Sequence, residues 1–505
     1  MTALHPARRR EQTSPPPVER IPFPTVDEVS RHCLQEEEPE TVHIEVHLPG
    51  RPEPARLRAA FGEALRRHPR ILMREAPGRW YRRRYEWELT PAPDVDPVSF
   101  PPPGPDALAH ARVRALSACP PLSASPPLRL EVINTDGKKE EKRGDGNGRD
   151  GNGRRDSRGN PTGDGGGCVL LLTLNHTALD GPACLRVLAT AAELYGGADN
   201  SPAPQPERPP GSVRAGSGPH LPAPSGSGWA RPVRVAADAQ GTATATGNGM
   251  LIAELAVPRR VPGGAGSAGS PGGSGGPPPY TVNDQLLVAT SLMVARWNRL
   301  HDRPTGPVRI TMPVDDRPRG IDMPIGNGTR LVEVGLSPED PADERLLTAE
   351  RPDPAAVARL LRRTAERTRA LKAAPRPPLG RGGALLTAPV LPVGVRAAVA
   401  RGLRRAVAPW TSTTLLSNIG RVPYPLDFGD AGRAQAVWFS APARMPRGLT
   451  VTTAGTNGRL HLALRWSRAL LDDDAAGTLA HLFEECLAAT AACGSATDTT
   501  TGSPP

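Results

Sequence analysis

The segment that most constrains the fold of this chain is an apolar run, VLLLTL, over residues 169–174. A run of this length and composition is typical of a buried strand, which other elements must cover. It leads directly into the heptapeptide NHTALDG at 175–181, after which Pro182 opens a segment with helical spacing. The sequence therefore predicts that a buried strand delivers a histidine, His176, into a short loop at the start of a helix.

This loop carries the candidate catalytic residues His176, Asp180 and Gly181. A neutral imidazole with an ordinary pKa of about 6.5 accepts a proton at neutral pH, so His176 is the candidate general base. Asp180 lies within one turn and is predicted to cap the following helix while it orients the loop. Gly181 allows a substrate to approach closely. Because no serine or cysteine lies in a nucleophile-elbow motif, direct transfer without a covalent enzyme intermediate is the simpler mechanism.

His176 and Asp180 also have the four-residue spacing of a pair of metal ligands. No third ligand lies near them in the sequence. We therefore predict that the site holds no metal and no permanently bound cofactor.

Charge and composition limit the partners of the chain. Its 62 Lys and Arg residues outnumber 52 Asp and Glu, for a net charge of +10, yet only four of the cations are lysines. The arginine excess accompanies 53 glycines and 61 prolines, a bias typical of GC-rich coding, and aromatic residues make up only 4%. Nucleic-acid binding, which combines basic stripes with interleaved aromatics, is therefore disfavoured. The charge suits an anionic partner such as a phosphate-bearing cofactor, an acidic carrier protein or a membrane surface.

Cysteine usage and targeting signals favour a cytoplasmic protein. The six cysteines are scattered with no C-x-x-C pair, so we expect reduced, mostly buried thiols. The arginines at 8–10 precede no apolar segment, which argues against a signal peptide. Residues 384–400, the longest weakly polar stretch, contain Pro389, Pro392 and Arg396 and are not expected to span a membrane. We expect a cytoplasmic monomer without a transmembrane segment.

Low-complexity segments separate two halves that each mix strands and helices, so the predicted fold class is α/β (α+β). Segments rich in Gly, Pro and Ser bury too little apolar surface to fold, and we expect them to be disordered or to act as spacers. The predicted boundaries are an arm at 1–20, an N-terminal lobe at 21–200 with an insert at 136–167, a linker at 201–228, a crossover at 229–280 with a Gly-rich insert at 261–279, a C-terminal lobe at 281–490 and a tail at 491–505.

Hydrophobic periodicity predicts the main elements of the first half. Residues 41–48 alternate as a strand with one solvated face, and 54–68 have the spacing of an amphipathic helix. Residues 128–133 form a further strand, which we expect to pair with 169–174 as a hairpin. The insert between them enlarges the hairpin loop, because added loop length costs little in closure entropy.

The second half opens with a helix and continues with alternating strands and helices. Thr281 and Asp284 predict a capping box at the start of a helix that extends to about residue 300. Further helices are predicted at 353–372, 394–407 and 473–489, and further strands at 308–313, 329–334, 413–416, 436–440, 449–453 and 460–466.

Several segments together resemble one superfamily. NHTALDG at 175–181 resembles the HHxxxDG motif of condensation domains and CoA-dependent acyltransferases, which include peptide-synthetase condensation domains, polyketide-associated acyltransferases, wax ester synthases and chloramphenicol acetyltransferase. The resemblance extends over about 22–489, apart from the inserts. The other similar segments are FGEALRRHPR at 61–70, TVND at 281–284, MPVDDR at 312–317 with IGN at 325–327, and TTLLSNIG at 413–420 with DFG at 427–429.

The resemblance implies a two-lobed, chloramphenicol-acetyltransferase-like fold with an active-site channel between the lobes. His176 stands at the position of the family's catalytic histidine, which deprotonates an acceptor hydroxyl or amine as it attacks an acyl thioester. Asp180 matches an aspartate that is chiefly architectural and often pairs with an arginine, for which Arg317 is the candidate. Gly181 matches a glycine that leaves room for the donor arm.

The remaining implications concern supporting residues and substrates. Asn175 replaces the first histidine of the motif, a position that mainly supports the loop, and Asn327 and Asn418 are candidate supporting residues from the second half. The implied donor is acyl-CoA or an acyl group on a phosphopantetheine carrier. Because this chain carries no carrier segment, such a carrier protein would act in trans.

Three functions remain open from the sequence. The first is a condensation-like acyltransferase of secondary metabolism with a hydroxyl or amine acceptor. The second is a lipid- or wax-ester-type O-acyltransferase of the same fold, whose acceptor is a fatty alcohol, a diacylglycerol or a glycolipid. The third is a catalytically inactive binding module that keeps the fold, which the substitution at Asn175 and the large inserts motivate.

Overall fold

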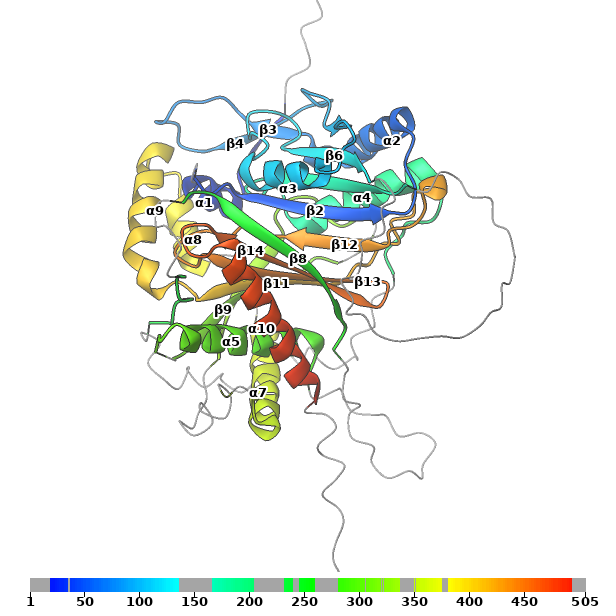
Figure 1. Cartoon of the computed structure of the whole chain (residues 1–505). Coiled ribbons are helices and arrows are strands. Elements are labelled where there is room, and N and C mark those ends of the chain that lie inside the picture. The colour runs from blue at the N-terminus through cyan, green and yellow to red at the C-terminus, as the bar shows by residue number, and fades with distance from the viewer. Residues whose placement is uncertain are drawn as a thin grey trace, which may run out of the picture.

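Two main sheets of six and five strands, a small three-stranded sheet and the helices packed against them make up the computed structural model (Figure 1). This architecture confirms the predicted α/β class with mixed sheets. The predicted arm, the insert at 136–167, the linker, the Gly-rich insert and the tail lie almost entirely outside the described residues. The structure describes residues 19–34, 37–135, 166–203, 231–238, 245–258, 280–304, 306–318, 320, 322–336, 349, 351–374 and 380–492.

The first sheet is built around the apolar run. Its strands, in spatial order, are β12 (Ala436–Ser440), β2 (Thr41–Leu48), β7 (Cys168–Asn175), β6 (Leu128–Asn134) and β5 (Val98–Ser99). β7 is buried along its whole length and runs antiparallel to both of its neighbours. The predicted pairing of β6 with β7 is confirmed, with Leu128 opposite Leu174.

The helices of the first half position the loop that follows β7. They are α1 (Thr25–His32), α2 (Pro54–Arg67), α3 (Ala107–Ser117) and α4 (Gly181–Gly196), with a short 3-10 turn, η1, at Pro69–Ile71. The predicted helix at 54–68 is confirmed as α2, which packs against α4. A small sheet stands beside them, in the order β1 (Arg20–Pro22), β4 (Glu86–Leu89) and β3 (Met73–Glu75).

The prediction that 41–48 has one solvated face was wrong. β2 lies between β12 and β7, and α3 covers the face that carries its polar side chains. Glu45 is fully buried there and accepts two hydrogen bonds of 2.8 Å from Arg112 of α3. Burial alone would raise the pKa of Glu45, but hydrogen bonds from His47 and Arg112 lower it to about 2. Alternation in this strand therefore reflects a buried ion pair, not a face in water.

The second sheet has six strands, five of which the sequence predicted. In spatial order they are β10 (Thr329–Leu336), β9 (Val308–Asp315), β11 (Thr414–Arg421), β13 (Leu449–Thr456), β14 (Arg459–Ser467) and β8 (Asn248–Ala256). β11 runs parallel to β9 and β13, and the other pairs are antiparallel. β8, which lies in the predicted crossover at 229–280, is the strand that the sequence did not indicate.

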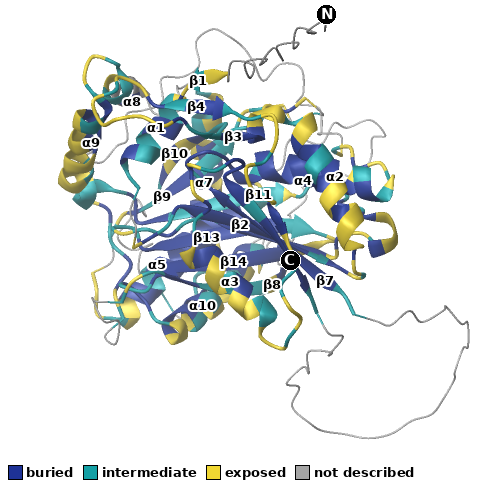
Figure 2. Cartoon of the chain, turned by 90° about the horizontal axis from the view of Figure 1, so that it is seen from above, coloured by how far each residue is buried: buried dark blue, intermediate teal, exposed yellow. Residues whose placement is uncertain are grey.

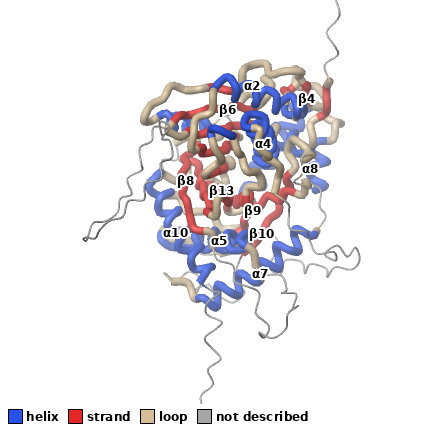
Figure 3. Tube along the Cα trace, turned by 90° about the vertical axis from the view of Figure 1, so that its right-hand side faces the viewer, coloured by secondary structure: helices blue, strands red, loops and turns tan. Residues whose placement is uncertain are grey.

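Helices cover the side of the second sheet that faces away from the first half (Figure 3). The predicted capping box is present, because Asp284 N–H bonds the Thr281 hydroxyl at 3.4 Å and Thr281 N–H bonds the Asp284 carboxylate at 2.8 Å. The covering helices are α5 (Val282–Leu300), α7 (Pro354–Ala373) and α10 (Asp473–Ala492). The other elements of the second half lie elsewhere: α8 (Gly380–Thr387) and α9 (Val393–Val407) pack against α1, η2 (Ala408–Trp410) follows α9, and η3 (Gly429–Ala431) packs against α4. The inner strands β13 and β14 of this sheet are mostly buried, whereas the outer faces of α9 and α10 are exposed (Figure 2).

The two halves interlock through β12. This strand belongs by sequence to residues 281–490, yet it pairs with β2 and forms the edge of the first sheet. Side chains before and along it, including Leu426, Phe428, Val437 and Phe439, complete the apolar core of the first half. Among the described residues, no helix is both long and apolar enough to cross a membrane.

Replacing Phe428 by Ala tests this interlocking. Phe428 is fully buried in the core of the first half, so removal of its ring should lower the free energy of unfolding by about 3–5 kcal/mol. Urea unfolding followed by circular dichroism measures the change. Leu300→Ala, at an exposed position of α5, is the control and should cost less than about 1 kcal/mol. Equal stabilities of the two variants would contradict the role of this segment in the core.

Candidate active site

The loop after β7 folds as the sequence predicted. β7 ends at Asn175, a turn follows, and α4 begins at Gly181 with Asp180 as its N-cap. The cap is confirmed by a hydrogen bond of 3.0 Å from Ala183 N–H to Asp180 Oδ1. Pro182 suits the first turn because this position needs no N–H donor. His176 therefore lies between a buried strand and a capped helix, which limits the motion of the loop.

The imidazole of His176 has a defined orientation. Its Nδ1 lies 3.0 Å from the carbonyl oxygen of Leu179. A carbonyl only accepts, so Nδ1 carries the hydrogen and donates, and Nε2 keeps a free lone pair. The backbone N–H of His176 donates to the Glu40 carbonyl at 2.8 Å, which fastens the loop to the start of β2. This tautomer is the one that a general base requires.

His176 lines a cavity of about 330 Å³ between the two sheets. Apolar side chains from α1, α4, β11 and β12 form much of its wall, and a polar end lies at the connection between β12 and β13. A cavity of this size with a few convergent polar groups has the character of a small-molecule site. Its apolar wall includes Val26, Val29, Leu185, Leu415, Ile419 and Phe439.

Asp180 is bound on both of its oxygens and faces the scaffold. Its Oδ2 accepts hydrogen bonds from Arg317 Nη2 at 2.7 Å and from Gly328 N–H at 2.9 Å. Arg317 also donates through Nε to Asp315 Oδ1 at 2.9 Å. Burial alone would lower the pKa of Arg317, but Asp315 and Asp180 raise it above its ordinary value. The ion pair that the resemblance implied is thus present, and it connects the loop to the end of β9.

Asn327 holds the same loop from the other side. Its Nδ2 lies 3.1 Å from the His176 carbonyl, 2.9 Å from the Thr177 carbonyl and 3.0 Å from Asp27 Oδ1. Asp27, on α1, also accepts a hydrogen bond of 2.9 Å from Trp87. Burial raises the pKa of Asp27 to about 6, although the bonds from Asn327 and Trp87 oppose the shift. These contacts make Asn327 a supporting residue and Asp27 a partner that the sequence did not reveal.

The other predicted residues have structural contacts. Asn175 donates to the Pro120 carbonyl at 3.0 Å and accepts from Thr177 N–H at 3.0 Å, so it supports the turn. Asn418 lines the cavity, but its Oδ1 accepts from Gly420 N–H at 2.9 Å. A Cβ on Gly181 would lie 3.2 Å from the ring of Phe439, so its small size lets β12 pack against the start of α4.

Several cavity residues were missed because they belong to no motif. Ser30 and Cys33 lie at the end of α1, a helix that the sequence did not predict, although its two acidic residues in the first turn are a start signal. Arg444 and Arg447 lie in the connection between β12 and β13. In the described part of the chain, no three His, Cys, Asp or Glu side chains lie together as a metal site.

Asp27→Asn tests the buried carboxyl beside the loop. Because the folded pKa of about 6 exceeds the ordinary 3.8, the native state binds more protons than the unfolded state between these values. The Asp27 carboxyl therefore makes its full contribution to the free energy of unfolding below about pH 4. The protein loses this contribution, up to about 3 kcal/mol, as the pH rises through about 6. Asp27→Asn should lack this component, whereas Asp96→Asn, at an exposed position, should keep it. Parallel stability curves for Asp27→Asn and wild type, from urea unfolding at pH 4 to 7, would refute the assignment.

Arg317→Met tests the ion pair with Asp180. The change leaves two buried carboxylates without their cation, so the free energy of unfolding should fall by about 3–5 kcal/mol. Arg459→Met removes an exposed pair with Glu254 and should cost no more than about 1 kcal/mol. Urea unfolding at pH 7 measures both, and a loss of similar size in the two variants would argue against a scaffold role for Arg317.

No family model matches the chain. Two proteins of Mycobacterium tuberculosis, both described only as uncharacterized, are similar to it. They come from strains CDC 1551 / Oshkosh and ATCC 25618 / H37Rv, and each is 25% identical over 470 residues. The match covers 88% of this chain and 94% of either relative.

Solved structures of similar fold span nearly the whole chain. The trichothecene 15-O-acetyltransferase TRI3 of Fusarium sporotrichioides has a TM-score of 0.56 at 11% identity, covering 93% of this chain and 95% of its own. The condensation domain of the monacolin K polyketide synthase MokA has a TM-score of 0.54 at 12% identity, covering 94% and 98%. The starter condensation domain of rhizomide synthetase RzmA, solved with C8-CoA and Leu-SNAC, has a TM-score of 0.54 at 12% identity, covering 92% and 93%. This chain therefore shares the two-lobed fold of these condensation domains and of this O-acetyltransferase, as the motif resemblance predicted.

Proposed function

We propose that this protein is an acyltransferase that moves an acyl group from a thioester to a hydroxyl or amine, with His176 as the general base. The observation that carries the proposal is the hydrogen bond from His176 Nδ1 to Leu179, at 3.0 Å, on a residue that lines the cavity between the two halves. This bond leaves Nε2 as the proton acceptor. Fixed geometry matters here, because a positioned base and two aligned substrates together supply much of the rate.

In the proposed reaction the acceptor oxygen or nitrogen attacks the thioester carbonyl while His176 Nε2 takes the acceptor proton. The tetrahedral intermediate then collapses, the carbon–sulfur bond breaks, and the imidazolium returns the proton to the leaving thiolate. The products are an ester or amide and a free thiol, and His176 regains its neutral form. Asp180, Arg317 and Asn327 hold the loop and take no part in proton transfer.

The donor is a thioester of coenzyme A or of a phosphopantetheine carrier. The condensation domain of similar fold solved with C8-CoA supports a medium-chain acyl donor. The apolar wall formed by Leu185, Ile419 and Phe439 also suits an aliphatic chain. This wall equally favours a fatty alcohol or glycolipid as acceptor, which is the lipid-type O-acyltransferase alternative.

His176→Ala tests the proposal. With octanoyl-CoA as donor and 1-octanol or octylamine as acceptor, product formed by the wild type should exceed that of the variant by about 10²–10⁴-fold. Mass spectrometry of the product and release of free thiol measure the rate. His481→Ala, at an exposed position of α10, is the matched control and should retain the wild-type rate.

Circular dichroism should show that His176→Ala keeps the wild-type fold, since the lost side chain makes a single hydrogen bond to the described residues. Equal transfer rates of the wild type and His176→Ala would rule out His176 as the general base. A wild type that binds octanoyl-CoA without transfer to either acceptor would favour the inactive binding module.

A further inference from the structure

Arg447 projects a guanidinium onto the cavity wall without a partner of its own. It follows β12 and lines the cavity, yet no hydrogen bond or ion pair connects it to another described residue. Burial and the nearby Arg444 lower the pKa of Arg447 to about 10, so the group stays charged at neutral pH. A cation removed from water is costly unless a counter-charge reaches it.

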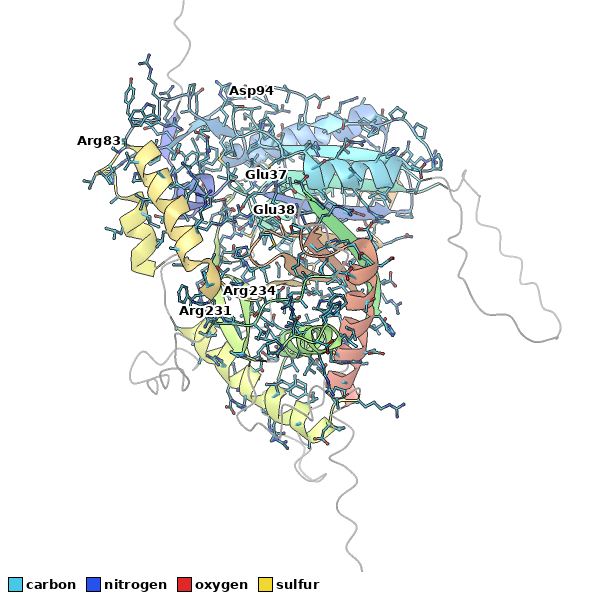
Figure 4. The ribbon with its side chains drawn as sticks, turned by 60° about the vertical axis from the view of Figure 1, so that its left-hand side comes forward. Glu37, Glu38, Arg83, Asp94, Arg231 and Arg234 are labelled. Atoms are coloured by element: carbon cyan, nitrogen blue, oxygen red, sulfur yellow. The ribbon has the colours of Figure 1, made fainter. Side chains whose placement is uncertain are left out.

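The nearby acidic side chains are already engaged. Glu40 forms an ion pair with Arg444, whose guanidinium also donates to the Cys33 carbonyl at 2.9 Å. Glu38 lies where the two halves meet (Figure 4) and accepts hydrogen bonds from Met445 N–H at 2.8 Å and from the Ser467 hydroxyl at 2.5 Å. One carboxylate on the cavity wall, Glu40, thus stands beside two guanidinium groups.

The other carboxylates on the wall are held elsewhere. Asp180 and Asp315 both line the cavity, but each is bound to Arg317, at 2.7 and 2.9 Å. Backbone N–H groups occupy further lone pairs of both carboxylates. The described carboxylates of the wall therefore form no ion pair with Arg447, although the charge of Glu40, which is paired with Arg444, acts on it.

This cationic end adjoins the catalytic loop. The Glu40 carbonyl accepts the His176 N–H at 2.8 Å, and the Ser30 hydroxyl lies 3.0 Å from Thr177 Oγ1 and 3.4 Å from Glu40 Oε2. Glu40 thus contacts both the loop and Arg444, and Arg447 lies three residues further along the same connection. A ligand bound by Arg447 would share the cavity with the acyl group that His176 serves.

We propose that the acceptor of this enzyme is an aliphatic molecule with a carboxylate or similar oxyanion, which pairs with Arg447 while its hydroxyl or amine lies at His176. The inference rests on the proposed function, because it takes the cavity as the acyl-transfer site. The apolar wall would hold the aliphatic part, and the guanidinium would give the anion charge-assisted hydrogen bonds. The phosphate of a pantetheine arm is a poorer fit, since the whole arm separates it from the thioester sulfur.

Binding of sodium octanoate and 1-octanol, measured by calorimetry and ligand-observed NMR, tests the proposal. The wild type should bind octanoate more tightly than octanol. Arg447→Gln should weaken octanoate about 10- to 100-fold and leave octanol within about twofold, because only the charge-assisted bonds are lost. Arg459→Gln, at an exposed position of β14, is the matched control and should bind both as the wild type does.

Three outcomes would overturn the inference. In the first, the wild type and Arg447→Gln bind octanoate with equal affinity. In the second, the wild type does not prefer octanoate over octanol. In the third, Arg447→Gln weakens the binding of 4′-phosphopantetheine but not that of octanoate. Thermal unfolding checks the fold of Arg447→Gln, whose stability should not fall, since the change removes an unpaired charge. His176→Ala should bind octanoate like the wild type, so failure of the anion site and failure of the base are distinguishable.

Discussion

The ion pair between Asp180 and Arg317 is the contact on which the candidate site depends. Asp180 caps α4 in the first half, Arg317 follows β9 in the second, and 2.7 Å separates their side chains. Asp180 is buried, the Arg317 side chain is only 9% exposed, and Asp180 also accepts N–H bonds from Ala183 and Gly328. The loop with His176 is therefore fixed to both halves at once. A general base needs such a fixed position, because proton transfer requires hydrogen-bond geometry with the acceptor.

The polar groups around the loop divide between scaffold and cavity. Backbone groups of the loop are satisfied by Glu40 and Asn327, and Nδ1 of His176 is satisfied by Leu179. Polar groups left for a ligand on the largely apolar wall include the second ring nitrogen of His176, the guanidinium of Arg447, Asn327 Oδ1 and Ser440 Oγ. For the proposed reaction, the candidate base, the apolar surface and the guanidinium of Arg447 together favour an amphipathic substrate over a wholly hydrocarbon one.

Features that depend on neighbours along the chain were predictable. The buried strand at 169–174, the cap at Asp180 and the capping box of Thr281 with Asp284 all follow from local periodicity and hydrogen bonding, and all are confirmed. The prediction that β2 has a solvated face was wrong, because α3 supplies a buried partner to Glu45 that the alternating pattern cannot reveal. The contact between Asp27 and Asn327 was missed, since it spans 300 residues.

By itself, the sequence determined the class of the fold, the strand, loop and helix around His176, and the motif resemblance that linked Asp180 to Arg317. Local propensity and short-range capping suffice for the strand, the loop and the helix, because their interacting groups lie a few residues apart. The pair of Asp180 and Arg317, which lie 137 residues apart, came from the resemblance alone. Only the tertiary structure decided that β12 joins the first sheet, that Leu179 orients the imidazole within a cavity, and that Arg447 faces this cavity with no ion pair to another described residue. These arise from packing between distant segments, where burial and the absence of a partner are properties of the assembled chain.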